Sequence, residues 1–254
     1  MILPIISAII TFHSEGLLAN KTLLGLERLR KFSEQRGTAV EFVIVLDSAD
    51  ADTTRVIKTN STIRPSDQII VVNNRDLGAS RNSGILVAKG NYIGIFDGDD
   101  YYSENWLFEA LKVVQQKGES VIAHPEFIIS FGAVHAVADV WDMDDEKNYS
   151  LSNCFSVNPW ASCSFGSKAT YLKHPYCRTD SKTTGFGYED WHWNLELISD
   201  GIRHVAVKQS ALFYRRKAAS MLTSMVAQGV IVRPTEFFNN TKKWKLGFHK
   251  VLEK

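Results

Sequence analysis

The first half of the chain alternates short, β-branched apolar runs with segments in which apolar residues recur at helical spacing. The apolar runs have the length of ordinary strands and occupy residues 5–12, 41–46, 68–72 and 92–96. One helix face is expected from Leu18, Thr22, Leu26 and Leu29. A shorter helix is expected over 80–89, ended by Gly90. Strands that alternate with helices predict an α/β fold with a mostly parallel sheet.

Beyond Gly118 the alternation is less regular. Strand-like stretches cover 121–129, 133–140 and 205–214, and an acidic stretch from 139 to 146 is typical of an exposed loop. Residues 189–200 have helical spacing and precede Gly201. Because no repeat or low-complexity linker interrupts the chain, we expect residues 1–254 to form a single domain.

Composition and charge limit the classes of partner. With 254 residues, 44% of them hydrophobic, the chain has enough apolar material for a large core. Its formal net charge of +1 disfavours binding to nucleic acid or to an anionic membrane through a polybasic surface. The apolar start, residues 1–10, is too short to span a bilayer and carries no basic leader. These features predict a cytoplasmic protein, and peripheral contact with the inner membrane face is kept as an alternative.

Three carboxylates directly follow the fourth expected strand, in the order Asp97-Gly98-Asp99-Asp100. Ligands of open α/β sheets bind at the carboxyl ends of the strands. Closely spaced carboxylates repel one another, and a divalent cation relieves that repulsion. Oxygen ligands suit Mg²⁺ or Mn²⁺, which usually complete their shell with waters and substrate phosphates. The pattern therefore favours a metal site for a diphosphate-bearing ligand, and the alternative is an acidic turn that caps the next helix.

Several segments together resemble the inverting glycosyltransferases of family 2. They are residues 7–15, 43–48, 74–84, 97–100 and the Gly187-Tyr188-Glu189-Asp190 stretch. The resemblance implies a glycosyltransferase A-type fold, Rossmann-like, with a mixed, mostly parallel sheet flanked by helices. It also implies transfer of a sugar, from a UDP-sugar by default, to a hydroxyl of a saccharide or other acceptor. Polysaccharide or glycoconjugate biosynthesis is the corresponding process.

The resemblance also assigns roles to residues on the donor side. Those expected to bind the nucleotide-sugar are Thr11, Glu15, Asp47, Arg81, Asp97 and Asp99. Asp47 is expected to accept hydrogen bonds from the base, and Arg81 to lie beside the nucleotide. Asp99 and Asp100 are both candidates for the metal, and the sequence leaves the choice between them open.

On the acceptor side, Asp190 is the expected general base, because it matches the Glu-Asp motif of the family. It starts an expected helix, whose dipole favours negative charge there. Glu189, Trp160 and Tyr188 are expected to contact the acceptor, with core packing as the alternative for the two aromatic residues.

The late basic segment and the tail complete the expected organisation. Arg215 and Arg216, with Lys217, are expected on a loop that neutralises the donor diphosphate. Residues 1–118 would bind the nucleotide-sugar, 119–216 the acceptor, and 217–254 would form a helical tail. The aromatic and apolar residues of that tail are expected to pack on their own domain, and they are Phe237, Phe238, Trp244, Leu246 and Phe248. Two other functions are kept open, a non-catalytic module on the same fold and a sugar nucleotidyltransferase.

Overall fold

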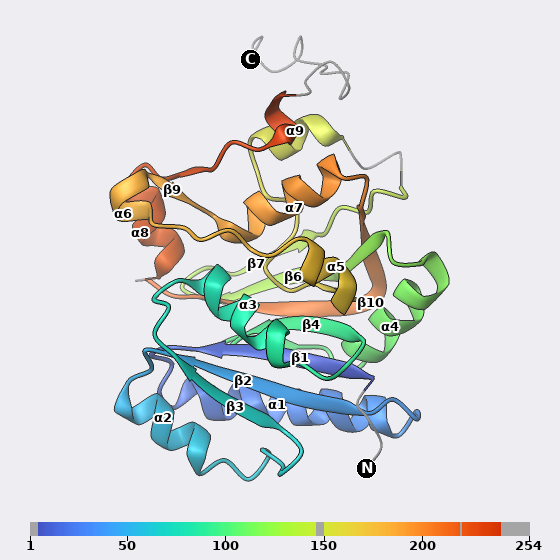
Figure 1. Ribbon diagram of the computed structural model, residues 1–254, viewed down its shortest axis with the longest axis vertical. Helices are drawn as coiled ribbons and strands as arrows, with labels where there is room; N and C mark the ends of the chain where they lie inside the picture. Colours follow the sequence, from blue (N-terminus) through green and yellow to red (C-terminus); the bar gives the residue numbers. More distant parts are fainter. Residues whose placement is uncertain (1–4, 146–149, 219, 240–254) are drawn as a thin grey trace.

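The computed structural model describes residues 5–145, 150–218 and 220–239. Within these residues a nine-stranded sheet is flanked by helices on both faces (Figure 1). Its strands lie in the order β3 (Gln68–Val72), β2 (Val40–Asp47), β1 (Ile6–Phe12), β4 (Tyr92–Asp97), β8 (Phe165–Ser167), β6 (Val121–Gly132), β10 (Arg203–Arg216) and β5 (Tyr101–Tyr102), and β7 (Ala136–Asp139) pairs with β6. The α/β fold predicted from the sequence is confirmed.

The sheet is parallel in its first half and mixed in its second. Strands β3, β2, β1 and β4 run parallel, so their carboxyl ends lie at one edge of the sheet. The short strand β8 is antiparallel to β4 and to β6, whereas β6 and β10 are parallel to each other. β8 therefore joins the two halves into one sheet.

Helices cover the two faces with separate apolar clusters. On one face lie α1 (Leu18–Glu34), α2 (Ala51–Lys58) and α4 (Trp106–Lys117), and on the other lie α3 (Leu77–Val87), α5 (Lys168–Lys173) and α7 (Glu189–Ser199). The remaining elements are short: η1 (Leu151–Phe155), α6 (Ser181–Thr184), β9 (Phe186–Gly187), α8 (Met221–Ala227), β11 (Ile231–Val232) and α9 (Glu236–Asn239). A third cluster joins η1, α7 and α9.

Two of the element boundaries that differ from those expected affect the site. Helix α3 begins at Leu77 rather than Ser80, because the carboxylate of Asp76 caps it by accepting a hydrogen bond from the Ala79 N–H at 2.7 Å. Arg81 therefore lies in the second turn of the helix. Strand β10 continues to Arg216, because its last residues pair with β6 as far as Gly132.

The described part of the tail packs back on the domain. Phe237 is fully buried in the third cluster, against residues of η1 and α7, and Phe238 lies at its border. This agrees with the packing expected from the sequence. Trp244, Leu246 and Phe248 lie outside the described residues.

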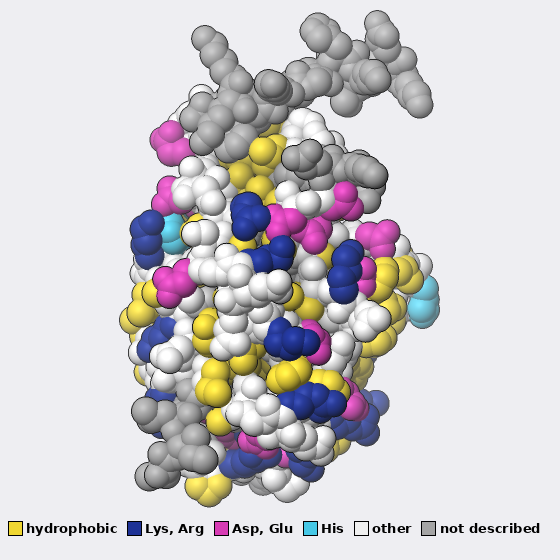
Figure 2. All heavy atoms as spheres, turned by 90° about the vertical axis from the view of Figure 1, so that its right-hand side faces the viewer, with side chains coloured by type: hydrophobic (Ala, Val, Ile, Leu, Met, Phe, Trp, Pro, Cys, Tyr) yellow, Lys and Arg dark blue, Asp and Glu magenta, His cyan; other side chains and the backbone are white. Residues whose placement is uncertain are grey.

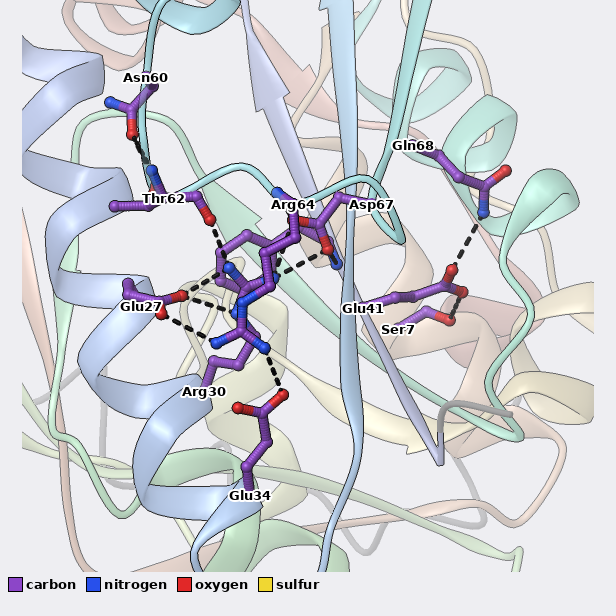
Figure 3. Close-up of polar contacts among 11 residues, drawn as sticks. Ser7, Glu27, Arg30, Glu34, Glu41, Asn60, Thr62, Arg64, Asp67 and Gln68 are labelled. Atoms are coloured by element: carbon purple, nitrogen blue, oxygen red, sulfur yellow. Dashed lines mark hydrogen bonds and ion pairs between the residues drawn. The ribbon is translucent and has the colours of Figure 1, made fainter. Parts of the chain in front are cut away.

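A charged network lies near the amino ends of the strands, opposite the edge where β1, β2 and β4 end (Figure 3). The guanidinium of Arg30, on α1, is fully buried and donates to both carboxylate oxygens of Asp67 at 2.8 Å. It also donates to Glu27 and to the Thr62 carbonyl. The loop before β3 is thereby attached to α1.

Charges on the outer surface are mixed in sign. Figure 2 shows one face on which Lys and Arg side chains lie among Asp and Glu side chains, without a continuous field of either sign. Some of the surface charges form ion pairs, such as Lys117 with Asp144 and Lys208 with Glu126. This distribution agrees with the small net charge of the chain.

Candidate active site

Polar side chains gather where β1, β2 and β4 end. Thr11 on β1 lies beside Asp97 on β4 in the sheet register, and Asp47 is the last residue of β2. Glu15 follows β1, and its carboxylate accepts a hydrogen bond from the His13 N–H at 2.6 Å. Burial raises the pKa of Glu15 above its ordinary value. The topology therefore brings the expected donor-side residues to one edge.

The carboxylate of Asp47 is already surrounded by donors of its own chain. One oxygen accepts from Ser48 Oγ at 3.1 Å and the Arg75 N–H at 3.0 Å, and the other from the Asp76 N–H at 3.2 Å and Ser80 Oγ at 2.8 Å. Partial burial raises the pKa of Asp47, but these hydrogen bonds outweigh it and leave the pKa below its ordinary value. Asp47 thus shapes the turn that enters α3. Its contact with a nucleobase stays a prediction.

The turn after β4 is pressed against β1, and this is why it contains Gly98. A Cβ atom at this position would lie 2.4 Å from Phe12 Cδ1 and 2.7 Å from the Thr11 carbonyl oxygen. No side chain fits such distances without moving backbone atoms. The glycine therefore lets three carboxylates follow one another in a tight turn at the edge of the sheet.

Asp100 is buried within this turn and is only half satisfied. Its Oδ1 accepts a hydrogen bond from the Arg215 N–H at 2.7 Å, whereas its Oδ2 has no donor among the described residues. Burial, followed by repulsion from Asp97 and Asp99, raises the pKa of Asp100 well above its ordinary value. A buried, unpartnered carboxylate oxygen is the kind of atom that a divalent cation satisfies.

Asp99 contributes the neighbouring carboxylate, and it is paired with a lysine. Lys217 Nζ lies 2.6 Å from Asp99 Oδ2. Among the described residues, no three Asp, Glu, His or Cys side chains converge closely enough to bind an ion by themselves. Two adjacent carboxylates nevertheless fit Mg²⁺ or Mn²⁺, which take the rest of their ligands from water and substrate phosphates.

Arg81 links the donor carboxylates to the helix that carries the expected base. Its guanidinium is fully buried and lies 2.9 Å from Asp97 Oδ1 and 2.9 Å from Glu189 Oε1. Burial alone would lower the pKa of Arg81, but attraction to Asp97 and Glu189 outweighs it and raises the pKa. Arg81 therefore lies beneath the carboxylates and connects β4 with α7. Its expected place beside the nucleotide stays a prediction.

The amino end of α7 presents Glu189 and Asp190. Glu189 is buried and faces Arg81 rather than an acceptor surface. Asp190 is only half-buried, and its oxygens accept hydrogen bonds from the Trp191 N–H at 2.8 Å and from Asn158 Nδ2 at 3.1 Å. Burial raises the pKa of Glu189 to about 7 and also raises that of Asp190, while Arg81 opposes both shifts.

Tyr188, immediately before this pair, has a left-handed backbone with φ of 57°. This conformation is rare for a residue with a bulky side chain and stores strain, which is common next to functional groups. The strained residue lets the chain leave β9 and enter α7 with both carboxylates turned toward Arg81 and Asn158. Its ring is half-buried and packs edge-on against Trp191 at 5.9 Å.

Trp160, expected to contact the acceptor, is instead a core residue. Only 1% of it is exposed, and its Nε1–H donates to the Trp141 carbonyl at 2.8 Å. Its ring stacks on those of His204 and His124, with centroid distances of 4.3 and 5.9 Å. No face of the indole is left for a sugar, because both the ring and its polar atom are already covered.

The arginines expected on a diphosphate loop lie on strand β10. Arg215 donates from Nε to the Asp99 carbonyl at 2.9 Å and from a terminal nitrogen to the Tyr101 hydroxyl at 2.6 Å. Arg216 lies over the ring of Tyr214 at 5.5 Å. Arg215 thus braces the acidic turn, and Lys217 is the basic residue whose charge meets a carboxylate of that turn.

Two polar residues of the site were missed by sequence reasoning. Ser162 Oγ donates to Asp97 Oδ2 at 2.5 Å, and Asn158 donates to Asp190. Both lie in the irregular loop between η1 and β8, where no periodicity or motif distinguishes them. Only the path of the backbone brings them to the carboxylates.

The sequence and fold of the chain match known glycosyltransferases. The family described as "Glycosyl transferase family 2" matches residues 7–141, which is more than half of the chain. The chain belongs to glycosyl transferase family 2. A curated relative, the UDP-Glc:alpha-D-GlcNAc-diphosphoundecaprenol beta-1,3-glucosyltransferase WfaP of Escherichia coli, is 26% identical over 187 residues, which are 72% of this chain and 68% of that protein.

Solved structures have a similar fold. The structure of S. aureus TarS 1-349 in complex with UDP-GlcNAc matches with a TM-score of 0.65 at 15% identity, covering 92% of this chain. The complex of the same protein with UDP matches with a TM-score of 0.61 at 14% identity, covering 94% of this chain. This chain spans 63% of the former structure and 72% of the latter. At such identities the likeness concerns the fold.

None of the helices in the described parts of the chain has the length and apolar character that crossing a bilayer requires.

Proposed function

We propose that this glycosyltransferase moves a sugar from a UDP-sugar to a hydroxyl of a saccharide acceptor in a single displacement with inversion. The observation that carries the proposal is the link through Arg81, which ties the donor-side carboxylate of Asp97 to the Glu189-Asp190 pair. Because the buried guanidinium of Arg81 holds both β4 and α7, the leaving group and the acceptor would meet in a defined geometry.

On the donor side, each residue has a proposed part. Thr11, Glu15 and Asp47 would line the nucleoside pocket at the ends of β1 and β2, and Asp97 would bind the donor ribose or sugar. Mg²⁺ or Mn²⁺ would be held by Asp99 and Asp100, with Asp100 Oδ2 as the unpartnered ligand atom. When bound, the ion supplies positive charge against the departing diphosphate. Lys217, next to Asp99, adds a further positive charge.

On the acceptor side, Asp190 would take the proton of the acceptor hydroxyl while that oxygen attacks the anomeric carbon of the donor. Its half-buried carboxylate is closer to solvent than that of Glu189, which Arg81 occupies. Glu189 would therefore act on Arg81 and not on the acceptor. Tyr188 remains the proposed aromatic contact of the acceptor.

A lipid-linked saccharide is the acceptor class that we propose first. The support is the similarity to WfaP, whose name describes an acceptor with a sugar attached to diphosphoundecaprenol. The division into a donor half (1–118), an acceptor half (119–216) and a tail (217–254) stays a proposal, and so does a cytoplasmic location with peripheral contact at the membrane.

The test uses Asp190→Asn, which keeps the shape of the side chain and removes its basicity. UDP release from UDP-glucose and UDP-GlcNAc is measured with a GlcNAc-diphosphate lipid as acceptor, and NMR reports the anomeric configuration of the product. We expect loss of turnover, unchanged calorimetric binding of UDP, and inversion in the wild type. Asp52→Asn, at an exposed ion pair on α2, is the matched control. Wild-type turnover in Asp190→Asn would refute the base, and UDP binding without turnover in the wild type would favour a non-catalytic module.

A further inference from the structure

A single loop contacts carboxylates on both sides of the site. It runs from residue 156 to 164, between η1 and β8. Near its start, Asn158 Nδ2 donates to Asp190 Oδ2 at 3.1 Å, and near its end Ser162 Oγ donates to Asp97 Oδ2 at 2.5 Å. Only three residues, 159–161, therefore separate a donor to the acceptor-side carboxylate from a donor to the donor-side carboxylate.

The orientation of the Asn158 amide is determined by its own neighbours. Its Oδ1 accepts from Asn194 Nδ2 at 3.0 Å and from the Trp160 N–H at 3.4 Å. Since the Trp160 N–H can only donate, the oxygen faces it and the NH₂ group faces Asp190. Asn194 is 1% exposed and lies one turn after Asp190 on α7, so the helix that carries the carboxylate also orients its partner.

The loop is anchored at its centre, so the Asn158 amide has little freedom to move. Trp160 is buried, is held to the Trp141 carbonyl at 2.8 Å, and stacks on His204 at 4.3 Å. Pro159 restricts the backbone of Asn158 to extended conformations. The position of Asn158 is therefore set by core packing and not by solvent-exposed side chains.

We propose that Asn158 is a positioning residue for Asp190. The amide of Asn158 donates to Oδ2 of Asp190, and the Trp191 N–H donates to Oδ1 of Asp190 at 2.8 Å. Each bond uses one lone pair of the carboxylate, so the remaining lone pairs face the acceptor hydroxyl. A donor aimed at the carboxylate also favours its ionised form, which is the form that accepts the hydroxyl proton. This inference rests on the proposed function, in which Asp190 is the base.

Charged groups on several elements face the same carboxylate. Arg81 on α3 favours its ionised form, whereas Asp97 on β4 and the adjacent Glu189 disfavour it. Two phenols, Tyr176 and Tyr214, also lie within electrostatic reach of Asp190. Removal of the Asn158 donor leaves these groups in place. The pKa of Asp190 then rises, and the acid limb of the rate profile moves to higher pH.

The test compares Asn158→Ala and the nearly isosteric Asn158→Asp with the wild type, using UDP release from UDP-glucose and UDP-GlcNAc. We expect kcat to fall by roughly tenfold or more, since a positioned general base contributes about 10²–10⁴-fold. KM for the UDP-sugar stays within about twofold, because Asn158 does not contact the donor carboxylates. Asn105→Ala is the control, since its Nδ2 also donates to one acceptor, the Gln209 carbonyl at 2.9 Å.

A double-variant cycle separates positioning from a structural role. In an Asp190→Asn background, Asn158→Ala should change kcat no further, because residues that act through one group are not additive. An equal loss of kcat in both backgrounds, or an unshifted acid limb in Asn158→Asp, overturns the inference. If Asp190→Asn is inactive and Asn158→Ala is fully active, the inference about Asn158 is overturned and the proposed base is kept. Fully active Asp190→Asn overturns the proposed base and the inference together.

Discussion

The buried Arg81 permits a comparison in which stability and catalysis are separated. Arg81 and Arg30 are both fully buried, and each binds two carboxylates. Arg81 lies within the site, whereas Arg30 lies at the opposite edge of the sheet, where Figure 3 shows it with Glu27 and Asp67. Lysine at either position keeps the charge but offers a single ammonium in place of the planar fork. The two substitutions are therefore chemically matched and differ in location.

The expected loss of stability follows from the contacts. Each lysine variant keeps one ion pair and loses at least one charge-assisted hydrogen bond, which contributes about 1.5–3 kcal/mol. For a domain of this size, about 1 kcal/mol changes the melting temperature by about 2–4 °C. We therefore expect Arg81→Lys and Arg30→Lys each to melt about 3–12 °C below the wild type, measured by calorimetry at pH 7.5.

The expected catalytic effects differ. Arg81→Lys releases either Asp97 or Glu189 from its partner and lets β4 and α7 shift, and a misplacement of about 1 Å costs about 10²-fold in rate. We expect kcat for UDP release to fall at least about tenfold in Arg81→Lys and to change less than about twofold in Arg30→Lys. Equal turnover in the two variants at equal loss of stability would mean that Arg81 only supports the fold.

Three further outcomes are expected. Since Asp190 must be ionised and burial raises its pKa, the acid limb of kcat/KM should lie at a higher pH than an ordinary aspartate gives; an acid limb near pH 4 in a pH–rate profile would contradict this. Asp100→Asn removes a buried carboxylate whose pKa is raised by burial, so the metal-free variant should melt at or above the wild-type temperature. The stabilisation that UDP gives in the presence of manganese should disappear. A lower melting temperature with that stabilisation intact would refute the assignment of Asp100 to the metal. Burial lowers the pKa of His124 to about 3. The stability contributed by the neutral His124 ring is therefore complete above the unfolded-state pKa of about 6.5 and is lost as the pH falls below that value. Between pH 7.5 and 5.5 the wild type should lose about 1.4 kcal/mol more than His124→Gln in urea unfolding, and parallel losses would show that the histidine is protonated in the folded chain.

The comparison with the sequence is clearest in the helix that carries Arg81. Helical spacing predicted this helix but placed its start at residue 80, because the capping carboxylate of Asp76 was not recognised. The resemblance to the family implied that Arg81 lies beside the nucleotide. Its burial between Asp97 and Glu189 depends on residues 16 and 108 positions away in the chain, and no local pattern contains that information.

The sequence by itself determined the alternation of strands and helices, the acidic turn after β4 and the Glu-Asp pair at the start of α7. These follow from local periodicity and from short motifs, which depend on neighbouring residues only. The tertiary structure decided the rest: that Trp160 fills the core, that Arg215 and Arg216 belong to a strand, and that Asn158 and Ser162 reach the carboxylates. The physical reason is that burial and hydrogen-bond partnership arise between segments far apart in the chain, when β8 joins the two halves of the sheet and folds the loop before it onto the site.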